Sequence, residues 1–527
     1  IPPWPRPLPL FLISSGPPAV YQLRPKLEKF ETLTRITVGE KDINKMNKTI
    51  LLVGETGGGK STLINTLVNY TMGVKWEDQV WFQIVEEEEK SQTESQTSDV
   101  IVYEIFGFEG KTLPYSLTII DTPGYGDTRG IEQDDIISER LLVLFRSDDG
   151  IHELNSVGLV MKATDNRLSD RQRYIFNSMI SLFGKNLEKN IVALMTHSDG
   201  MPPENALKAL EAAKIKCARN EKNEPVYFLI DNQQSKERKE EYEDSLKKSW
   251  DLTECQMHYF VSFLGRCGPQ RLMKTKKVLK KRVKLKASIQ NLQEKIKVTE
   301  LKQREIRQIQ VALKTHEEIV KKNKKFIVEI DEVYKEKENI KGGMWGCFYE
   351  GALCCTVCEE NCHYPGCTAA WYPEHCQVMK DGRCTVCTRK CPASKHVKYK
   401  WRYVTKTRRV TKTMEEMKAK YERNKDEGQN KSSLLENLEK EMMKLIAERS
   451  KYLDESYQHV VSLDELALKI DSVSTVVNLD FLIEKMKEEG DTEKVQKLEE
   501  MRCRVDEGTR AALEYIQNKL TTSGKRS

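Results

Sequence analysis

The sequence has no long apolar run. Among its 527 residues, no stretch approaches the roughly 18 uninterrupted apolar residues of a membrane-spanning helix, so none is predicted. The net charge of +6 is small for this length and excludes a chain that is polycationic throughout. A secretory signal is not predicted either, because prolines interrupt the apolar start at Ile1–Pro9. We expect residues 1–20 to be a disordered proline-rich leader or an incomplete N-terminus, with a lead-in to residue 44.

Apolar runs alternate with amphipathic segments between residues 45 and 265. This alternation predicts an α/β domain with a mostly parallel sheet and helices on both faces. The expected strands are Ile50–Val53, Val100–Phe106, Leu117–Ile120, Gly158–Met161, Ile191–Met195 and Val226–Ile230, and the expected helices include Asp170–Leu182 and Asn205–Cys217.

A glycine-rich loop follows the first of these strands and precedes a helix. Its pattern, Gly-x4-Gly-Lys-Ser, is that of a P-loop, which binds the phosphates of a nucleoside triphosphate. Backbone N–H groups and the helix N-terminus would surround the phosphates, Lys60 would reach the β- and γ-phosphates, and the Ser61 hydroxyl would hold Mg²⁺. The predicted nucleotide-binding residues here are Gly54, Glu55, Thr56, Gly57, Gly58, Gly59, Lys60, Ser61 and Thr62.

A second nucleotide motif, Asp121-Thr122-Pro123-Gly124, ends the strand at residues 116–120. Asp121 would hold Mg²⁺ through a water molecule. Gly124 would offer its backbone N–H to the γ-phosphate, and its conformational freedom would let the loop move on hydrolysis. In a mobile first switch, a threonine must reach Mg²⁺ and the γ-phosphate, and Thr93 and Thr97 are the candidates.

These motifs resemble those of the septin and AIG1-type (immune-associated nucleotide-binding) P-loop GTPases. The resemblance rests on Gly54–Leu67 and Asp121–Thr128, and on Asn166–Ser169 running into Ser181–Gly184; it covers residues 45–265. It implies a GTP-binding fold, hydrolysis of GTP to GDP, and dimerisation across the nucleotide face. The spacing in AIG1-type proteins favours Thr93 over Thr97 as the metal ligand.

The base-recognition motif departs from the usual Asn-Lys-x-Asp, since the chain has Thr-His-Ser-Asp at residues 196–199. The Asp199 carboxylate can accept from both the N1–H and the exocyclic amine of guanine, a pairing that adenine does not offer. His197 would lie on the purine face, and Asn232 occupies the place of the last base-contacting loop. A plain surface turn is the alternative at Ser198–Gly200.

The usual water-orienting glutamine is missing, because Tyr125 follows Gly124. Hydrolysis is therefore expected to be slow, or to be completed by a residue of a second protomer. His152 is one candidate for that residue, although most surface histidines have no such role. Within one chain, the predicted catalytic residues are Lys60, Thr93 and Gly124.

Beyond residue 265 the sequence becomes helical. Six of the seven positions that recur every seven residues from Leu285 to Ile327 are apolar, which predicts a long helix with an imperfect coiled-coil seam. The basic stretch Lys274–Lys286 would contact an anionic membrane or nucleic acid, or else form a solvated helix face. We expect a long basic helix over 266–340, a Cys/His-rich module over 341–400 at the turn of a helical hairpin, a returning helix over 401–460, and C-terminal helices with a frayed tail over 461–527.

Ten of the 14 cysteines lie between Cys347 and Cys391. In a nucleotide-binding protein of the reducing cytoplasm, clustered cysteines favour metal ligands over the alternative, a disulfide scaffold. A repeated Cys-x2-Cys-x3-Cys pattern supplies enough ligands for two structural Zn²⁺ sites, with the pairing open and with Cys347, Cys354, Cys376, His363 and His375 as spare ligands or bystanders. The eight predicted ligands are Cys355, Cys358, Cys362, Cys367, Cys384, Cys387, Cys391 and His396.

Three functions fit this sequence. The first is a slow GTPase switch that dimerises in a nucleotide-dependent way and transmits its state to the helical arm. The second is an interaction or scaffold protein that uses a zinc-tipped arm, with a slow or inert nucleotide domain. The third is an ATP-driven machine on the same P-loop.

Overall fold

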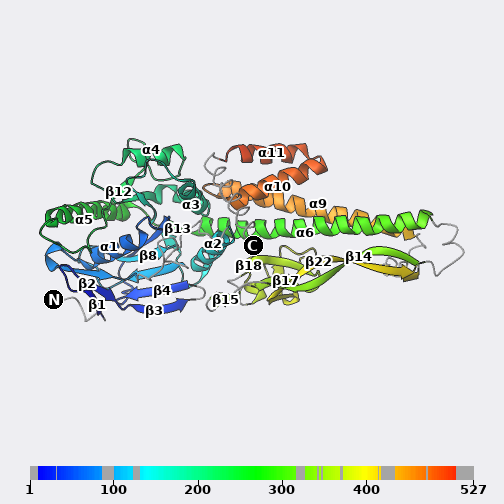
Figure 1. Cartoon of the computed structure of the whole chain (residues 1–527), viewed down its shortest axis with the longest axis horizontal. Coiled ribbons are helices and arrows are strands. Elements are labelled where there is room, and N and C mark those ends of the chain that lie inside the picture. Colours follow the sequence, from blue (N-terminus) through cyan, green and yellow to red (C-terminus); the bar gives the residue numbers. More distant parts are fainter. Residues whose placement is uncertain are drawn as a thin grey trace. The chain divides into compact units, whose positions relative to one another are not determined.

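A computed structural model of the chain forms two compact units (Figure 1). The first contains Ile1–Lys280, Leu463–Leu479 and Glu499–Ser527, and the second contains Lys281–Ser462 and Asp480–Leu498. The structure describes residues 10–30, 33–85, 100–122, 131–315, 327–340, 344–345, 348–349, 351–367, 372–413, 415–416, 434–470 and 473–505.

An eight-stranded sheet forms the centre of the first unit, and it confirms the predicted α/β class. Five adjacent strands, from β12 to β8, are parallel, β7 is antiparallel to β8, and a further, three-stranded sheet contains β1, β2 and β6. The main sheet runs β12 (Tyr227–Leu229), β11 (Ile191–Thr196), β10 (Ser156–Lys162), β5 (Asn47–Gly54), β8 (Ser116–Asp121), β7 (Ile101–Ile105), β4 (Leu33–Val38) and β3 (Lys26–Phe30), and the other strands are β1 (Leu10–Ser14), β2 (Ala19–Leu23) and β6 (Val80–Gln83).

Helices cover both faces of the main sheet. Ile50 and Leu52 of β5 belong to the core cluster formed with α1 and α5, whereas Leu51 and Val53 point to the opposite face and are equally buried. A continuous apolar strand of this kind is typical of a parallel sheet buried on both sides. The helices of this domain are α1 (Lys60–Met72), α2 (Ile131–Arg146), α3 (Asp170–Ile180), α4 (Glu204–Ala212) and α5 (Glu243–Arg266).

Residues 10–38 belong to the first unit, so the expected disordered leader and lead-in are wrong there. They form β1 to β4 and add strands to both sheets. Prolines 17, 18 and 25 fall between these strands rather than inside them, so they do not prevent strand pairing. Val20 and Leu23 of β2 are buried in the same core as α1. Residues 1–9 lie outside the described residues.

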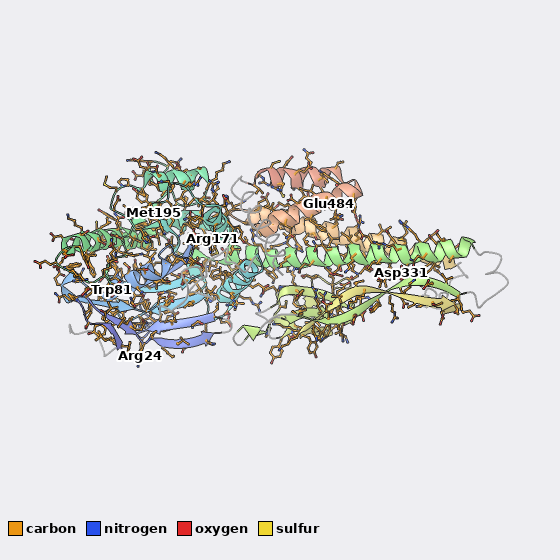
Figure 2. The ribbon with its side chains drawn as sticks, in the orientation of Figure 1. Arg24, Trp81, Arg171, Met195, Asp331 and Glu484 are labelled. Carbon is orange, nitrogen blue, oxygen red and sulfur yellow. The ribbon has the colours of Figure 1, made fainter. Side chains whose placement is uncertain are left out.

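The second unit combines most of two long helices with a two-stranded ribbon; the first residues of one helix and the last residues of the other belong to the first unit. The helices are α6 (Met273–Thr315) and α9 (Leu434–Leu466). In the ribbon, β14 (Ile327–Asn339) pairs antiparallel with β22 (Trp401–Thr413). Asp331 of β14 is labelled in Figure 2. Gln308 of α6 donates to the Asp331 carboxylate over 2.8 Å and accepts from the Asp331 backbone N–H over 2.9 Å.

The prediction of two coiled-coil helices is therefore wrong for residues 327–339 and 401–413, which are strands. Val328 and Ile330 are buried while Ile327 and Glu329 are exposed, which is the two-residue period of a strand. The heptad pattern placed Ile327 on a helical seam, but the alternation of β-branched residues around it was the stronger signal.

The cysteine-rich module lies between β14 and β22 in the chain and packs against α6. A three-stranded sheet of β17 (Gly351–Cys355), β18 (Glu360–Cys367) and β21 (His396–Tyr399) forms its base. Ala287 of α6 belongs to the module's buried cluster, and the Asn291 amide donates to the Val386 carbonyl oxygen over 3.3 Å. Both residues lie many turns before the C-terminal end of α6. The prediction that the module lies at the turn of a helical hairpin is therefore wrong.

The predicted C-terminal helices are present as far as Cys503. Within the described residues, no helix has the length and apolarity that a bilayer crossing needs. The remaining elements are α10 (Val473–Glu489), α11 (Thr492–Cys503), β9 (Glu153–Leu154), β13 (Gln270–Arg271), β15 (Met344–Trp345), β16 (Phe348–Tyr349), β19 (Met379–Lys380) and β20 (Arg383–Cys384).

Replacing Gly39 with alanine tests whether β4 is an integral strand. Gly39 has φ +79°, and an added Cβ would lie 2.1 Å from the Phe106 carbonyl oxygen. We expect Gly39→Ala to lower the free energy of unfolding by about 3 kcal/mol or more, since a backbone clash adds to the left-handed strain of about 1–2 kcal/mol. Urea denaturation followed by tryptophan fluorescence measures this loss.

Gly107→Ala is the matched control, because Gly107 has φ +82° but open space around its Cβ position. It should cost only the strain of about 1–2 kcal/mol. Equal losses for the two variants would contradict the close packing of β4 against β7.

Candidate nucleotide-binding site

The P-loop lies between β5 and α1, as predicted. Gly54 ends β5 and Lys60 begins α1, and Gly57 and Gly59 have φ +78° and +91°, which a residue with a Cβ adopts only under strain. Gly59 is the N-cap of α1 and offers no side chain to the helix's first N–H groups. These donors and the positive end of the helix dipole suit an anion.

The Lys60 side chain is buried against the start of the loop. Its ammonium donates to the carbonyl oxygens of Gly54 over 2.7 Å and Glu55 over 3.1 Å. Burial lowers the pKa of Lys60, and the carboxylates of Asp121 and Glu55 oppose this shift. A phosphate would add the negative charge that favours the charged form of this lysine.

The end of β8 places Asp121 beside the P-loop. Asp121 is fully buried and lies opposite Leu52 in the parallel pairing of β5 with β8. The next residue, Thr122, donates its hydroxyl to the Leu52 carbonyl oxygen over 2.9 Å, a contact that the sequence did not suggest. The other predicted residues of the two switch segments, Thr93, Thr97 and Gly124, lie outside the described residues.

Residues after β11 and β12 hold the P-loop in place. The Thr196 hydroxyl donates to the Gly58 carbonyl oxygen over 2.8 Å. The Asn232 amide donates to the Gly59 carbonyl oxygen over 3.4 Å, and its oxygen accepts from the Thr66 hydroxyl of α1 over 3.3 Å. Asn232 was predicted to contact the base, but in this structure its amide contacts the loop and α1.

His197 and Asp199 lie at the exposed carboxyl end of β11. His197 has φ +53°, and its Nδ1 lies 3.1 Å from the Thr196 hydroxyl. One Asp199 oxygen accepts from the Met201 N–H over 2.9 Å, and the Ser198 hydroxyl accepts from the Gly200 N–H over 3.1 Å. The segment is thus a tight turn that also presents a carboxylate to solvent. It follows Thr196, the last residue of β11.

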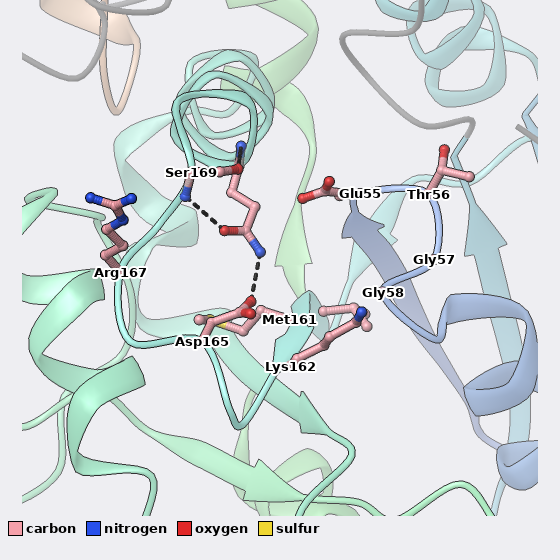
Figure 3. Close-up of a pocket in the computed structure, with 11 residues that line it drawn as sticks. Glu55, Thr56, Gly57, Gly58, Met161, Lys162, Asp165, Arg167 and Ser169 are labelled. Atoms are coloured by element: carbon pink, nitrogen blue, oxygen red, sulfur yellow. Dashed lines mark hydrogen bonds between the residues drawn. The ribbon is translucent and has the colours of Figure 1, made fainter. Parts of the chain in front are cut away.

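A cavity of about 250 Å³ opens beside the P-loop (Figure 3). On its far side, Gln172 of α3 donates to the Asp165 carboxylate over 2.7 Å and forms a capping box with Ser169. Arg167 and Lys162 are exposed residues of the same lining. The motifs did not identify Lys162, Asp165 or Gln172, although the Ser-x-x-Gln pattern before α3 is a recognisable helix start.

The structure brings together seven of the eight predicted zinc ligands. They form two groups, and both groups contain Cys387. The structure does not describe the side chain of the eighth residue, Cys367. The spare candidate Cys347 lies outside the described residues. The two groups are Cys355, Cys358, Cys387 and Cys391, and Cys362, Cys384, Cys387 and His396.

Two weaker candidates have structural contacts of their own. The His152 ring lies 3.1 Å from the Asp148 carbonyl oxygen and 3.5 Å from the Lys276 ammonium. In the basic stretch, Lys284 is buried and Lys276 and Lys286 are half-buried. The stretch is therefore not a continuous exposed basic face.

Replacing Thr196 with valine tests the contact between β11 and the P-loop. Valine keeps the shape but removes the donor to Gly58, and one such hydrogen bond contributes about 1 kcal/mol. We expect Thr196→Val to weaken the binding of a fluorescent guanosine triphosphate about fivefold in a titration. Thr196→Ser keeps the hydroxyl and should bind within about twofold of the parent chain; an equal loss in both variants would contradict this role.

Comparisons with known proteins identify the domain. Residues 48–249 match a sequence model of the AIG1 family. No curated protein matches the chain in sequence. Similar solved structures include Toc33 from Arabidopsis thaliana in complex with Mg²⁺ and GMPPNP, at 14% identity and a TM-score of 0.30 over 43% of this chain and 88% of that one.

A second similar structure concerns the chloroplast translocon components atToc33 and psToc159, for whose GTPase activity dimerization is important. It has 16% identity and a TM-score of 0.31 over 43% of this chain and 86% of that one. Structural scores this low carry no inference about this chain. The family match and the P-loop geometry agree with the motifs, and residues 48–249 form an AIG1-type domain with a P-loop.

Proposed function

We propose that the first unit binds GTP with Mg²⁺ and hydrolyses it slowly to GDP, as a switch that dimerises across its nucleotide face. The observation that carries the proposal is the convergence of Lys60, Asp121 and the Gly57–Gly59 turn at one end of the sheet. Lys60 and the glycine turn come from the P-loop, and Asp121 comes from the second nucleotide motif. Their functions are complementary in phosphate chemistry.

The phosphates would lie along the backbone N–H groups of the P-loop at the N-terminus of α1. Lys60 would exchange its carbonyl partners for β- and γ-phosphate oxygens and neutralise charge as water attacks the γ-phosphorus and the bond to GDP breaks. Mg²⁺ would supply further charge neutralisation, and Ser61 and Asp121 fit its preference for oxygen ligands. Thr93 and Gly124 would complete the γ-phosphate contacts.

The guanine base would lie at the end of β11. One carboxylate oxygen of Asp199 accepts from the Met201 N–H, and the other oxygen remains for a ligand. The residue is exposed. That carboxylate would accept from the guanine N1–H and exocyclic amine, and the His197 ring would lie against the purine face. Adenine does not offer this pair of donors, so the same site would favour GTP over ATP.

A second copy of the chain would complete the catalytic site. The position after Gly124 holds Tyr125 rather than a residue that orients water, which is the basis for a slow rate. Two exposed basic side chains, Lys162 and Arg167, line the cavity beside the P-loop, and they would provide contacts for the acidic groups of a partner. Dimer formation would then couple nucleotide state to assembly.

Lys60→Ala tests the hydrolysis. Without the ammonium, transition-state charge on the γ-phosphate is poorly neutralised, and we expect a loss of about 100-fold or more in single-turnover phosphate release from GTP. Lys208→Ala is the control, because Lys208 is an exposed residue of α4 that pairs only with Glu204 among the described residues. Phosphate release at the parent rate by Lys60→Ala would refute the proposed site.

Asp199→Asn tests the base preference. Loss of a charged acceptor costs about 1.5–3 kcal/mol, so GTP affinity should fall about 10- to 100-fold. Xanthosine triphosphate carries a carbonyl where guanine has its amine, and the asparagine amide can donate to it, so its affinity should rise. If Asp199→Asn lowers the affinity for both nucleotides, or leaves the affinity for GTP unchanged, Asp199 does not recognise the base. As a control, Asp251→Asn on α5 should change the affinity for neither nucleotide.

A further inference from the structure

Two sets of potential metal ligands in the second unit share one cysteine. The ligand atoms of each set lie within 4.8 Å of one another. The first set draws on both sequence repeats, with Cys355 and Cys358 from one and Cys387 and Cys391 from the other. The second set does so as well, because Cys362 joins Cys384, Cys387 and His396. The repeats therefore interlock, and Cys387 lies where the two sets meet.

The spacing of the sulfur atoms suits a tetrahedral metal ion. Two thiolates at about 2.3 Å from zinc, with a tetrahedral angle between them, lie about 3.8 Å apart. The Sγ atoms of Cys358 and Cys391, which come from different repeats, lie 3.8 Å apart. A disulfide bond is much shorter, at about 2.05 Å. The cysteines of both sets are free thiols.

Backbone N–H groups point at the sulfur atoms in both repeats. The Cys358 N–H donates to Cys355 Sγ over 3.4 Å, and the Cys387 N–H donates to Cys384 Sγ over 3.3 Å. The Cys391 N–H donates to the shared Cys387 Sγ over 3.2 Å. Donors of this kind stabilise negative charge on sulfur and orient metal-bound thiolates. The turns are thus organised around thiolates.

His396 supplies an independent indication of a metal. Its side chain is 3% exposed, and its Nδ1 lies 3.0 Å from the Pro392 carbonyl oxygen, which only a protonated Nδ1 can satisfy. The other ring nitrogen, Nε2, is buried and has no hydrogen-bond partner of normal geometry among the described residues. A histidine that donates from one nitrogen to a backbone carbonyl and directs the other at thiols has the arrangement of a zinc ligand.

We propose that this module binds two zinc ions as one binuclear cluster, with the Cys387 thiolate bridging both metals. Two tetrahedral ions need eight coordination positions, and seven ligands fill them when one thiolate serves twice. The eighth residue of the sequence pattern, Cys367, is then not required. The assignment replaces two separate four-ligand sites with a single unit that ties the repeats together.

Two ammonium groups contact the backbone of the module near the proposed cluster, and that of Lys390 also pairs with the Glu455 carboxylate over 2.7 Å. Six thiolates and two Zn²⁺ leave a net charge of −2. The Lys335 ammonium donates to the Cys358 carbonyl oxygen over 3.3 Å, and the Lys390 ammonium donates to the Thr385 carbonyl oxygen over 2.7 Å. The cluster would be structural, because five of its ligands belong to the buried core of this small module.

Cadmium NMR of the full chain distinguishes a shared thiolate from separate sites. Chain loaded with ¹¹³Cd in place of zinc should give two resonances split by coupling between the metals, which a bridging sulfur transmits. Chain purified under reducing conditions without added metal should contain two zinc ions by mass spectrometry. Two uncoupled resonances, or a zinc content of one or none, would overturn the proposal.

Three serine variants provide the matched test. Cys387→Ser should bring the zinc content well below one per chain, since both metals lose a ligand, while GTP binding by the first unit reports that the chain is folded. Cys354→Ser replaces a buried cysteine that belongs to neither set, and it should keep two zinc ions. Cys367→Ser should keep them as well; loss of one zinc in this variant would favour separate four-ligand sites and refute the bridge.

Discussion

The first unit depends on the parallel pairing of β5 with β8. This register sets Asp121 opposite Leu52, two residues before the P-loop begins, and so brings a buried carboxylate near the buried Lys60 ammonium. Burial of one such charge is costly, but here the carbonyl oxygens of the loop and two carboxylates surround the lysine. The apolar residues of both strands exclude water from this end of the sheet and strengthen the electrostatic interactions there.

Two residues from outside the P-loop hold the loop in place. Thr196 and Asn232 bind backbone carbonyls of Gly58 and Gly59, and they come from the ends of the two strands beyond β10. The same ends carry the turn with His197 and Asp199. The proposed phosphate and base sites would therefore be mechanically connected, since a shift of β11 would move both the support of the P-loop and the carboxylate proposed to bind the base.

The second unit is constrained by the small core of its cysteine-rich module. Half of the buried residues in the core of its module are cysteines, and small cores of this kind rarely supply enough apolar burial for stability. The proposed zinc cluster would provide the missing free energy, because zinc would bind the thiolates and the imidazole only in the folded arrangement. The ribbon of β14 and β22 and the helix α6 then give this module a rigid support, with Ala287 and Asn291 in contact with it.

The sequence by itself determined the α/β domain, six of the eight strands of its main sheet, the P-loop, and seven residues of the cysteine module that the structure brings together. Each of these depends on local pattern: apolar runs of strand length, glycines before Lys60, and Cys-x2-Cys turns. Only the tertiary structure decided that residues 10–38 add strands, that residues 327–339 pair with 401–413, that Asn232 contacts the P-loop, and that Cys387 belongs to two ligand sets. These are contacts between residues far apart in the chain, and no local period specifies which distant partner a strand edge, an amide or a thiol will meet.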